Sequence, residues 1–314
     1  MRSYTSFQSK MSANSGFWPV FLLLLILFIG ISNYFTLNRI AAQQAIIEVP
    51  QLKPFPQPEV KQEILFPKNT PVPLAPASIY SDIAKKLRKE ALLRVQSDRD
   101  AILKAANGTS NTAFYKSIKM EAFCEKNERI GGRGDGGKQT CNVAAVKKDD
   151  CTLLSLGLHN QIDYDLAIYE ATGKRCKILG ADKDKQNSRT EKSYDNMGGQ
   201  IFIGTIPKDL TIPEMILKAG RNEVELLKID IEGGETTALE PLIKDYYVCQ
   251  IMIELHGQKP IEHLDMLRMM AKYGFRIFNV EPNPFCEKCC EYSLINELCM
   301  AQYGVVPLGV TIPH

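Results

Sequence analysis

The segment Leu226-Leu-Lys-Ile-Asp-Ile-Glu-Gly-Gly-Glu235 decides the fold. Its aliphatic residues recur at every second position, which predicts a buried strand, and the two glycines predict a turn into a following helix. Asp230 and Glu232 end this strand, where a buried carboxylate is costly unless it is paired or has a function. The segment therefore predicts a functional strand-to-helix turn. A purely structural alternative, in which Lys228 neutralises an acid and Glu235 only begins the helix, stays open.

Similar short apolar runs lie on both sides of this segment. Stretches with helical character separate them, one of them at 163–172. Short buried strands that alternate with helices indicate an α/β domain with a mostly parallel central sheet. The predicted strands cover 151–157, 176–181, 200–205, 224–231, 248–255 and 276–280.

Two further positions at strand ends indicate a cofactor site. Gly157 ends the first predicted strand, and Asp182 ends the second, 25 residues further on. In open α/β sheets, ligands bind at the carboxyl ends of the strands, where a glycine lets the backbone approach the ligand and an acid accepts hydrogen bonds from ribose hydroxyls. The combination predicts an adenosine-bearing cofactor. The alternatives are a plain turn and a solvated loop carboxylate.

The residues Lys228-Ile-Asp-Ile-Glu-Gly-Gly-Glu235 resemble the signature of the FkbM-type methyltransferases. The resemblance covers residues from about 120 to about 305 and extends to the membrane-anchored animal branch of that family. It implies a Rossmann-like methyltransferase fold that uses S-adenosylmethionine as its cofactor. The supporting segments are Gly131–Cys141, Ser155-Leu-Gly157, Glu254-Leu-His-Gly257 and Glu291–Cys299.

The resemblance also implies roles for single residues. It places Ser155, Gly157 and Asp182 at the cofactor, and Asp230 and Glu232 beside the reaction cleft. The turn Ser-Leu-Gly-Leu-His-Asn, which begins at Ser155, departs from the usual first motif of an acid and several glycines. Altered cofactor contacts, or a catalytically inactive binding module of the same fold, therefore remain alternatives.

Methyl transfer to a hydroxyl is an in-line displacement that also needs a proton acceptor. The candidates are Asp230, Glu232 and His256, and this interpretation requires no metal. The predicted function is O-methylation of a hydroxyl on a glycan or another secretory-pathway substrate. The alternative enzyme is a luminal glycosyltransferase in which Asp182-Lys-Asp184 holds a metal ion and a nucleotide sugar.

The N-terminal part of the sequence predicts a membrane anchor. Residues 17–35 contain no charged residue, and a helix needs about 20 apolar residues to cross a bilayer. Residues 1–16 carry two basic residues and no acid, which favours a cytosolic tail. We therefore expect a single-pass type II protein whose domain lies in the lumen of the Golgi or endoplasmic reticulum. A signal peptide cleaved at Ala41-Ala42 is the alternative.

Three segments complete the predicted organisation. Residues 36–78 form a proline-rich stem, residues 79–111 form a helical lead-in with Ser81 as its N-cap, and residues 112–314 form the methyltransferase domain. The sequon at Asn107 predicts N-glycosylation on the luminal side. A net charge of +2 predicts no nucleic-acid partner, and the oligomeric state stays open.

The cysteines agree with an oxidising compartment. All nine lie beyond the predicted anchor, where disulfides form, and an odd number leaves at least one thiol over. A disulfide cluster is predicted near the C-terminus, with a zinc site of four cysteines as the alternative. The cysteines concerned are Cys286, Cys289, Cys290 and Cys299.

Overall fold

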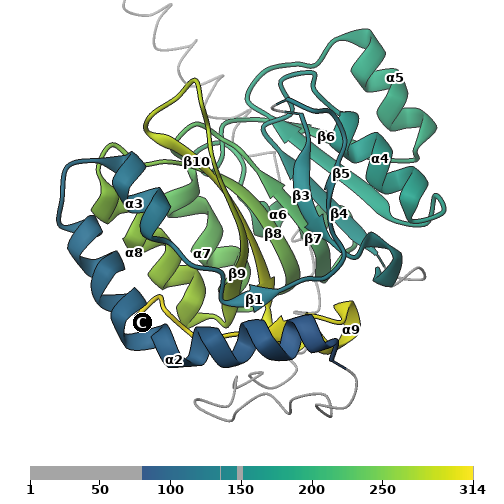
Figure 1. Ribbon diagram of the computed structural model, residues 1–314. Coiled ribbons are helices and arrows are strands. Elements are labelled where there is room, and N and C mark those ends of the chain that lie inside the picture. Colours follow the sequence, from purple (N-terminus) through teal and green to yellow (C-terminus); the bar gives the residue numbers. More distant parts are fainter. Residues whose placement is uncertain (1–79, 135, 147–150, 314) are drawn as a thin grey trace, which may run out of the picture. The chain divides into compact units, whose positions relative to one another are not determined.

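The computed structural model describes residues 80–134, 136–146 and 151–313 (Figure 1). The predicted cytosolic tail, the transmembrane anchor at 17–35 and the whole proline-rich stem at 36–78 lie outside the described residues. Among the residues that are described, no helix combines the length and the apolar character needed to cross a membrane.

A seven-stranded sheet forms the centre of the domain, in the order β6-β5-β4-β7-β8-β10-β9. The strands from β6 to β8 are parallel to their neighbours, whereas β10 is antiparallel to both β8 and β9. The mostly parallel α/β fold is therefore confirmed. The strands are β4 (Thr152–Leu156), β5 (Lys177–Asp182), β6 (Gln200–Ile203), β7 (Glu223–Ile229), β8 (Tyr247–His256), β9 (Phe275–Pro282) and β10 (Cys289–Asn296).

The strand order reverses between β4 and β7. The chain moves from β4 through β5 to β6 on one side, and from β7 to β8 on the other. Loops that leave such a switch point diverge, so a crevice opens beyond the carboxyl ends of the two central strands. Gly157 and Asp230, which follow these strands, therefore lie at the place where a ligand is expected.

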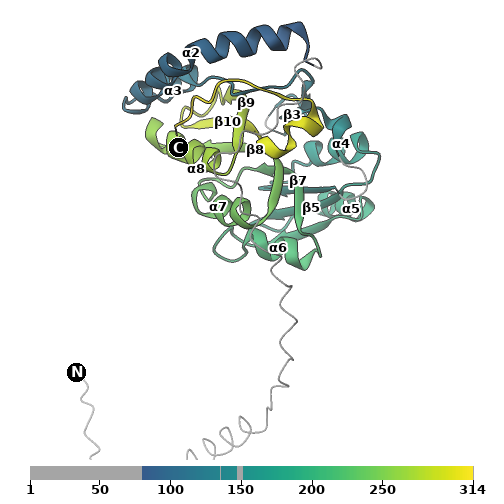
Figure 2. The ribbon, with the colours of Figure 1, turned by 90° about the horizontal axis from the view of Figure 1, so that it is seen from below.

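Helices cover both faces of the sheet (Figures 1 and 2). Alternating strand residues separate two cores: Leu154 and Leu156 face one, and Leu153 faces the other. The first core holds α2 (Asp82–Ala106), α3 (Asn111–Ser117), α6 (Ile212–Lys218), α7 (Glu235–Asp245) and α8 (Pro260–Lys272). The second holds α4 (Asp163–Ala171), α5 (Ser188–Asn196) and α9 (Met300–Tyr303).

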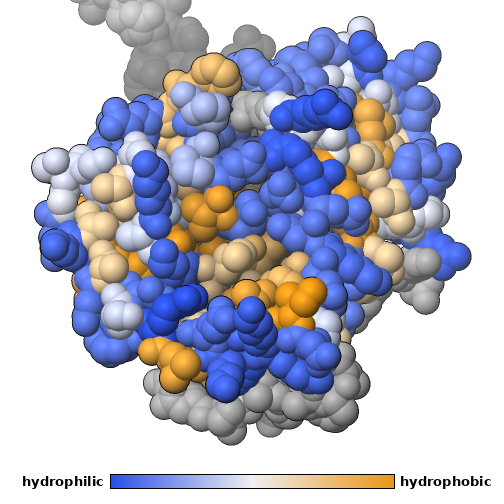
Figure 3. Space-filling model, in the orientation of Figure 1, coloured by the Kyte–Doolittle hydropathy of each residue, from blue (hydrophilic) through white to orange (hydrophobic). Residues whose placement is uncertain are grey.

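Helix α2 begins where the sequence predicts it. Ser81 is the N-cap, and its hydroxyl accepts a hydrogen bond from the Ala84 amide at 3.2 Å. Its apolar residues are not all buried, because Ile83 and Leu92 are 64% and 50% exposed while Ile102 is fully buried. On the face shown in Figure 3, hydrophobic residues form separate patches among hydrophilic ones. Asn107, the C-cap of α2, is exposed, and its glycosylation remains a prediction.

Small antiparallel pairs and disulfides complete the domain. The pairs are β1 (Ala122–Phe123) with β11 (Val306–Pro307), and β2 (Asn127–Ile130) with β3 (Lys138–Cys141). The disulfides are Cys124–Cys141, Cys151–Cys176, Cys249–Cys299 and Cys286–Cys289.

The leftover thiol expected from an odd number of cysteines is confirmed as Cys290, which is buried. Burial raises the pKa of the Cys290 thiol to about 12. The zinc alternative is wrong for this structure. Cys299 bonds to Cys249 in β8, and Cys286 bonds to Cys289, so these sulfurs do not converge on one ion.

Candidate active site

A cavity of about 720 Å³ lies at the carboxyl ends of the parallel strands. The loops after β4, β5, β6 and β7 form its walls and contribute Gly157, Asp182, Gly204 and Asp230. This volume is within the range of small-molecule and cofactor sites, which runs from about 300 to about 1,000 Å³. The structure thus brings two of the three predicted cofactor residues, Gly157 and Asp182, and two of the predicted catalytic residues, Asp230 and Glu232, to one cavity.

Gly157 holds the two central loops together. Its φ is +77°, and a Cβ atom there would lie 1.7 Å from the carbonyl oxygen of Asp230. The Gly157 amide donates to Ala181 at 2.9 Å, and its carbonyl accepts from the Lys228 ammonium at 2.8 Å. Only glycine combines this backbone conformation with this close approach. The turn after β4 is therefore fixed, and it presents backbone rather than a side chain at this point.

Asp182, the last residue of β5, lines the cavity and is held in place by backbone amides. One carboxylate oxygen accepts from the His159 amide at 2.7 Å, and the other accepts from the Asp184 amide at 2.9 Å. Each oxygen keeps a further lone pair, so an oriented acceptor for ribose hydroxyls remains. Both oxygens of Asp182 thus serve backbone amides. Among the described residues, the side-chain groups that are arranged to hold a metal do not include the Asp182–Asp184 pair.

Ser155 lies away from the cavity. It is fully buried within β4, on the same face of the sheet as Leu153, and it does not line the cavity wall. The physical reason is strand alternation: position 155 points onto a face of the sheet, and the chain reaches the sheet edge only at Gly157. The predicted cofactor contact of Ser155 therefore has no support in this geometry.

A buried lysine in the cavity wall, Lys228, interacts with a buried acid, Asp165, that does not line the cavity. Burial raises the pKa of Asp165 to about 6, although Lys228 lowers it. Burial also lowers the pKa of Lys228, and the charge of Asp165 only partly offsets that effect. Tyr194 donates to the Asp165 carboxylate at 3.1 Å. The sequence predicts Lys228 only as a neutralising partner, whereas in the structure Lys228 also donates to the Gly157 carbonyl.

The three predicted catalytic residues meet at the rim of the cavity. His256, at the end of β8, places Nε2 3.7 Å from Asp230 Oδ1 and 3.5 Å from Glu232 Oε2. Asp230 and Glu232 line the cavity, and the imidazole lies beside them. The side chains of His256 and Asp230 are 8% and 17% exposed, whereas that of Glu232 is 77% exposed. The cluster thus joins a buried base to a carboxylate in contact with solvent.

Glu235 orders this cluster from behind. Its carboxylate accepts from the Ile231 and Gly233 amides at 2.8 and 2.9 Å, and it lies 3.4 Å from His256 Nδ1. These bonds hold the loop in which Glu232 adopts a φ of +58°. Glu235 does begin α7, as the structural alternative proposes, but it also contacts the site. The sequence contains no local signal for this second contact, because His256 lies on another strand.

The acids around His256 determine its charge. Burial lowers the pKa of the imidazole, but Glu235, Asp230 and Glu232 together outweigh burial, and the pKa of His256 is raised. The three carboxylates thus stabilise the protonated form of the imidazole.

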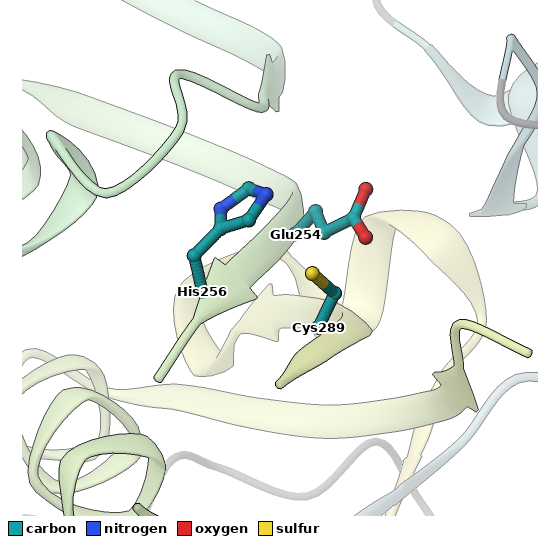
Figure 4. A group of neighbouring side chains, drawn as sticks. All are labelled: Glu254, His256 and Cys289. Atoms are coloured by element: carbon teal, nitrogen blue, oxygen red, sulfur yellow. The ribbon is translucent and has the colours of Figure 1, made fainter. Parts of the chain in front are cut away.

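A second group shares the His256 ring (Figure 4). Glu254 and His256 project from β8, and Cys289 is the β10 residue paired with His256. Burial raises the pKa of Glu254 to about 7, even though Asn283 donates to it at 2.9 Å. The sulfur of Cys289 is bonded to Cys286, and neither Glu254 nor Cys289 lines the cavity.

Comparison with known proteins identifies the family. A family model described as "Methyltransferase FkbM domain" matches residues 110–277, which is more than half of the chain. No curated protein matches.

Several solved structures align with part of the chain. The Methanococcus jannaschii fibrillarin pre-rRNA processing protein has 14% identity and a TM-score of 0.34, with 55% of this chain and 84% of that chain covered. Aeropyrum pernix fibrillarin with natively bound S-adenosyl-L-methionine has 14% identity and a TM-score of 0.34, covering 55% and 83%. A SAM-dependent methyltransferase from Aquifex aeolicus has 14% identity and a TM-score of 0.30, covering 48% and 85%. At these scores, the assignment rests on the family match.

The cavity at the strand-order reversal, with its glycine turn and ribose-type acid, defines an α/β enzyme that binds a nucleotide-like cofactor. The chain belongs to the FkbM family of methyltransferases, and S-adenosylmethionine is its cofactor. The residues fit this group: the cavity is large enough, Gly157 offers bare backbone, and the carboxylate of Asp182 is oriented at its wall. The predicted enzyme class and cofactor are confirmed, and the glycosyltransferase alternative is set aside.

Proposed function

We propose that this methyltransferase transfers a methyl group to a hydroxyl of a glycan or another secretory-pathway substrate. In this proposal the protein is a single-pass type II membrane protein of the membrane-anchored animal branch, with its domain in the lumen of the Golgi or endoplasmic reticulum. The observation that carries the acceptor assignment is the position of Asp230 and Glu232. They line the same cavity as the cofactor residues Gly157 and Asp182, on the adjoining wall.

The residues divide the work as follows. Gly157 and Asp182 position the cofactor, which supplies a methyl group on a sulfonium centre. Holding the acceptor oxygen in line with that methyl group is the main source of rate acceleration. Asp230, Glu232 and His256 lie where the hydroxyl must lose its proton, and we assign them to activation of that hydroxyl.

Two features support the compartment. Disulfides persist in secretory compartments and are rare in the cytosol, and this domain has four of them. The sequon residue Asn107 is exposed at the end of α2, where a glycan transferase can reach it. The charge-free segment at 17–35 supplies the predicted anchor.

The first test is calorimetric binding of S-adenosylmethionine to the full-length chain in detergent. Asp182→Ala removes a charged acceptor, so the affinity should fall about ten- to a hundredfold, equivalent to about 1.5–3 kcal/mol. Asp195→Ala, which removes an exposed carboxylate on α5, should bind like the wild type. A folded chain that does not bind the cofactor would favour the inactive binding module.

The second test concerns the acceptor. Chains purified from cells should be incubated with radiolabelled cofactor and a panel of glycans, and the label should be released by cleavage of methyl ethers rather than by mild base, which removes methyl esters. Transfer only to carboxyl or amino groups would refute the hydroxyl assignment.

A further inference from the structure

We propose that Asp230, Glu232 and His256 bind one divalent metal ion at the rim of the cofactor cavity, and that this ion holds the acceptor oxygen. The metal site itself depends only on the geometry of these side chains and of their neighbour Glu235. Its role in transfer rests on the proposed function.

The separations of the donor atoms suit a shared ion. One carboxylate oxygen from each acid and a ring nitrogen of His256 all lie within 4.8 Å of one another. Two ligands held about 2.1 Å from a metal are about 3.0 Å apart at a right angle and about 3.4 Å apart at a tetrahedral angle. The Nε2 distances of 3.7 Å to Asp230 and 3.5 Å to Glu232 exceed the tetrahedral value by about 0.3 and 0.1 Å, and the right-angle value by about 0.7 and 0.5 Å. Small side-chain rotations would therefore close the site.

The surroundings of His256 give a second, independent observation. Its side chain is 8% exposed and directs Nε2 at both carboxylates, while the buried Nδ1 has no hydrogen-bond partner. Glu235 lies 3.4 Å from that Nδ1, and two backbone amides hold its carboxylate in place. Metal-binding histidines commonly give their other ring N–H to a carboxylate, which fixes the tautomer that leaves Nε2 to the metal, and Glu235 lies where a small movement would make that bond.

The donor set indicates the class of metal. One imidazole and two carboxylates suit Mn²⁺ or Zn²⁺, and no thiolate takes part. Three protein ligands leave coordination positions for water or substrate, as in catalytic sites. The Glu232 side chain is 77% exposed, so those positions face solvent and an incoming acceptor. The neighbouring group with Glu254 and Cys289 lacks these properties, because its sulfur is in a disulfide and it does not line the cavity (Figure 4).

The ion would activate the hydroxyl directly. Coordination to a divalent ion lowers the pKa of a bound hydroxyl, so that its proton passes to solvent water at the exposed side. The oxygen lone pair then forms the O–CH₃ bond while the C–S bond breaks, and that electron pair stays on the sulfur. The metal keeps its oxidation state throughout. Asp230, Glu232 and His256 act as ligands in this scheme, so none of them has to accept the proton.

The test is Mn²⁺ binding to the full-length chain after treatment with EDTA, measured from the loss of the free-ion electron paramagnetic resonance signal. We expect one Mn²⁺ per chain. Glu232→Gln should weaken binding at least tenfold, and this exposed side chain can change without disturbing the core. Asp230→Asn should do the same. Asp184→Asn and Glu170→Gln, which alter acids outside the cluster, should leave binding unchanged.

Two results would overturn the proposal: a folded chain that binds no Mn²⁺, and binding that survives both Glu232→Gln and Asp230→Asn or is lost in Asp184→Asn. Binding of S-adenosylmethionine is measured separately in EDTA. If Mn²⁺ binds as expected but the cofactor does not, the metal site stands and the proposed function fails. If the cofactor binds but Mn²⁺ does not, the metal site fails alone.

Discussion

Replacing Gly157 with alanine is the sharpest test of how the β4 and β7 loops create the cavity. The new Cβ would lie 1.7 Å from the Asp230 carbonyl oxygen, whereas real Cβ contacts essentially never fall below 3.0 Å. The two loops must therefore separate by more than about 1 Å. That movement strains two hydrogen bonds, from the Asp230 amide to Leu156 at 3.0 Å and from Lys228 to Gly157 at 2.8 Å.

The magnitude follows from these contacts. A φ of +77° costs an alanine about 1–2 kcal/mol, and weakening two buried hydrogen bonds adds about 1–3 kcal/mol. We expect Gly157→Ala to lower the free energy of unfolding by about 2–5 kcal/mol in urea titrations, and to abolish measurable cofactor binding. Gly173→Ala is the matched control, because Gly173 has a φ of +69° with no atom within 4 Å of the added Cβ. It should cost only about 1–2 kcal/mol and keep cofactor affinity. Equal losses for the two variants, with cofactor binding intact in both, would refute the reasoning.

Three further predictions concern other parts of the domain. Burial lowers the pKa of His263 to about 4, against about 6.5 in the unfolded chain, so the free energy of unfolding falls as the pH drops from 6.5 towards 4. Between pH 7.5 and pH 5.0, the free energy of unfolding of the wild type should fall by about 2 kcal/mol more than that of His263→Gln in urea titrations. Equal losses for the two proteins would contradict this prediction. The Cys290 thiol is buried and has a pKa of about 12, so iodoacetamide should modify no cysteine of the native protein. After unfolding without reductant it should modify one cysteine, counted by mass spectrometry. Labelling of the native protein would show that Cys290 is not buried as described. In the chain-entropy account, removing the Cys249–Cys299 disulfide, which spans 50 residues, should lower the free energy of unfolding by about 4 kcal/mol. Removing Cys124–Cys141, which spans 17 residues, should lower it by about 3 kcal/mol. A larger fall in melting temperature for the second variant would contradict that account.

The sequence predicts the parallel strands because they are buried on both faces. Runs such as Leu226–Ile229 and Val248–Leu255 are rich in aliphatic residues, and this composition can be recognised without knowing which strands pair with them. The N-cap at Ser81 is equally local, since its hydroxyl bonds an amide three residues away. Element existence and the glycine turn at Gly157 could therefore be predicted.

Strand β10 could not be predicted, because the reasons for its burial are distant in sequence. Its residue Glu291 is compensated by Lys138, a buried lysine that the β2–β3 hairpin contributes from far earlier in the chain. Ser293 likewise donates to the Gln139 carbonyl at 2.9 Å. Polar residues within a run usually argue against a buried strand, and only the tertiary partner reverses that conclusion.

The candidate site shows the same division between local and distant information. Asp230 and Glu232 could be found from one strand end, whereas Glu235 reaches His256 from the turn after the neighbouring strand. Ser155 belongs to the segment that resembles the family, but strand alternation buries its side chain away from the cavity. A motif in the sequence identifies the edge of the sheet where chemistry takes place. It does not say which of its residues point over that edge.

The segment from Lys228 to Glu235 buries charged side chains whose desolvation is offset by fixed partners. A buried lysine or carboxylate destabilises a domain unless its partners are fixed. Lys228 is fixed by the Gly157 carbonyl, and Glu235 by two amides of the turn between them. The first bond positions the turn after β4, and the second positions the loop whose acids, Asp230 and Glu232, line the same cavity. Because Lys228 lies in β7 and Glu235 follows the turn that leaves this strand, a shift of β7 would move the two halves of the site together and preserve their relative geometry, which in-line transfer requires.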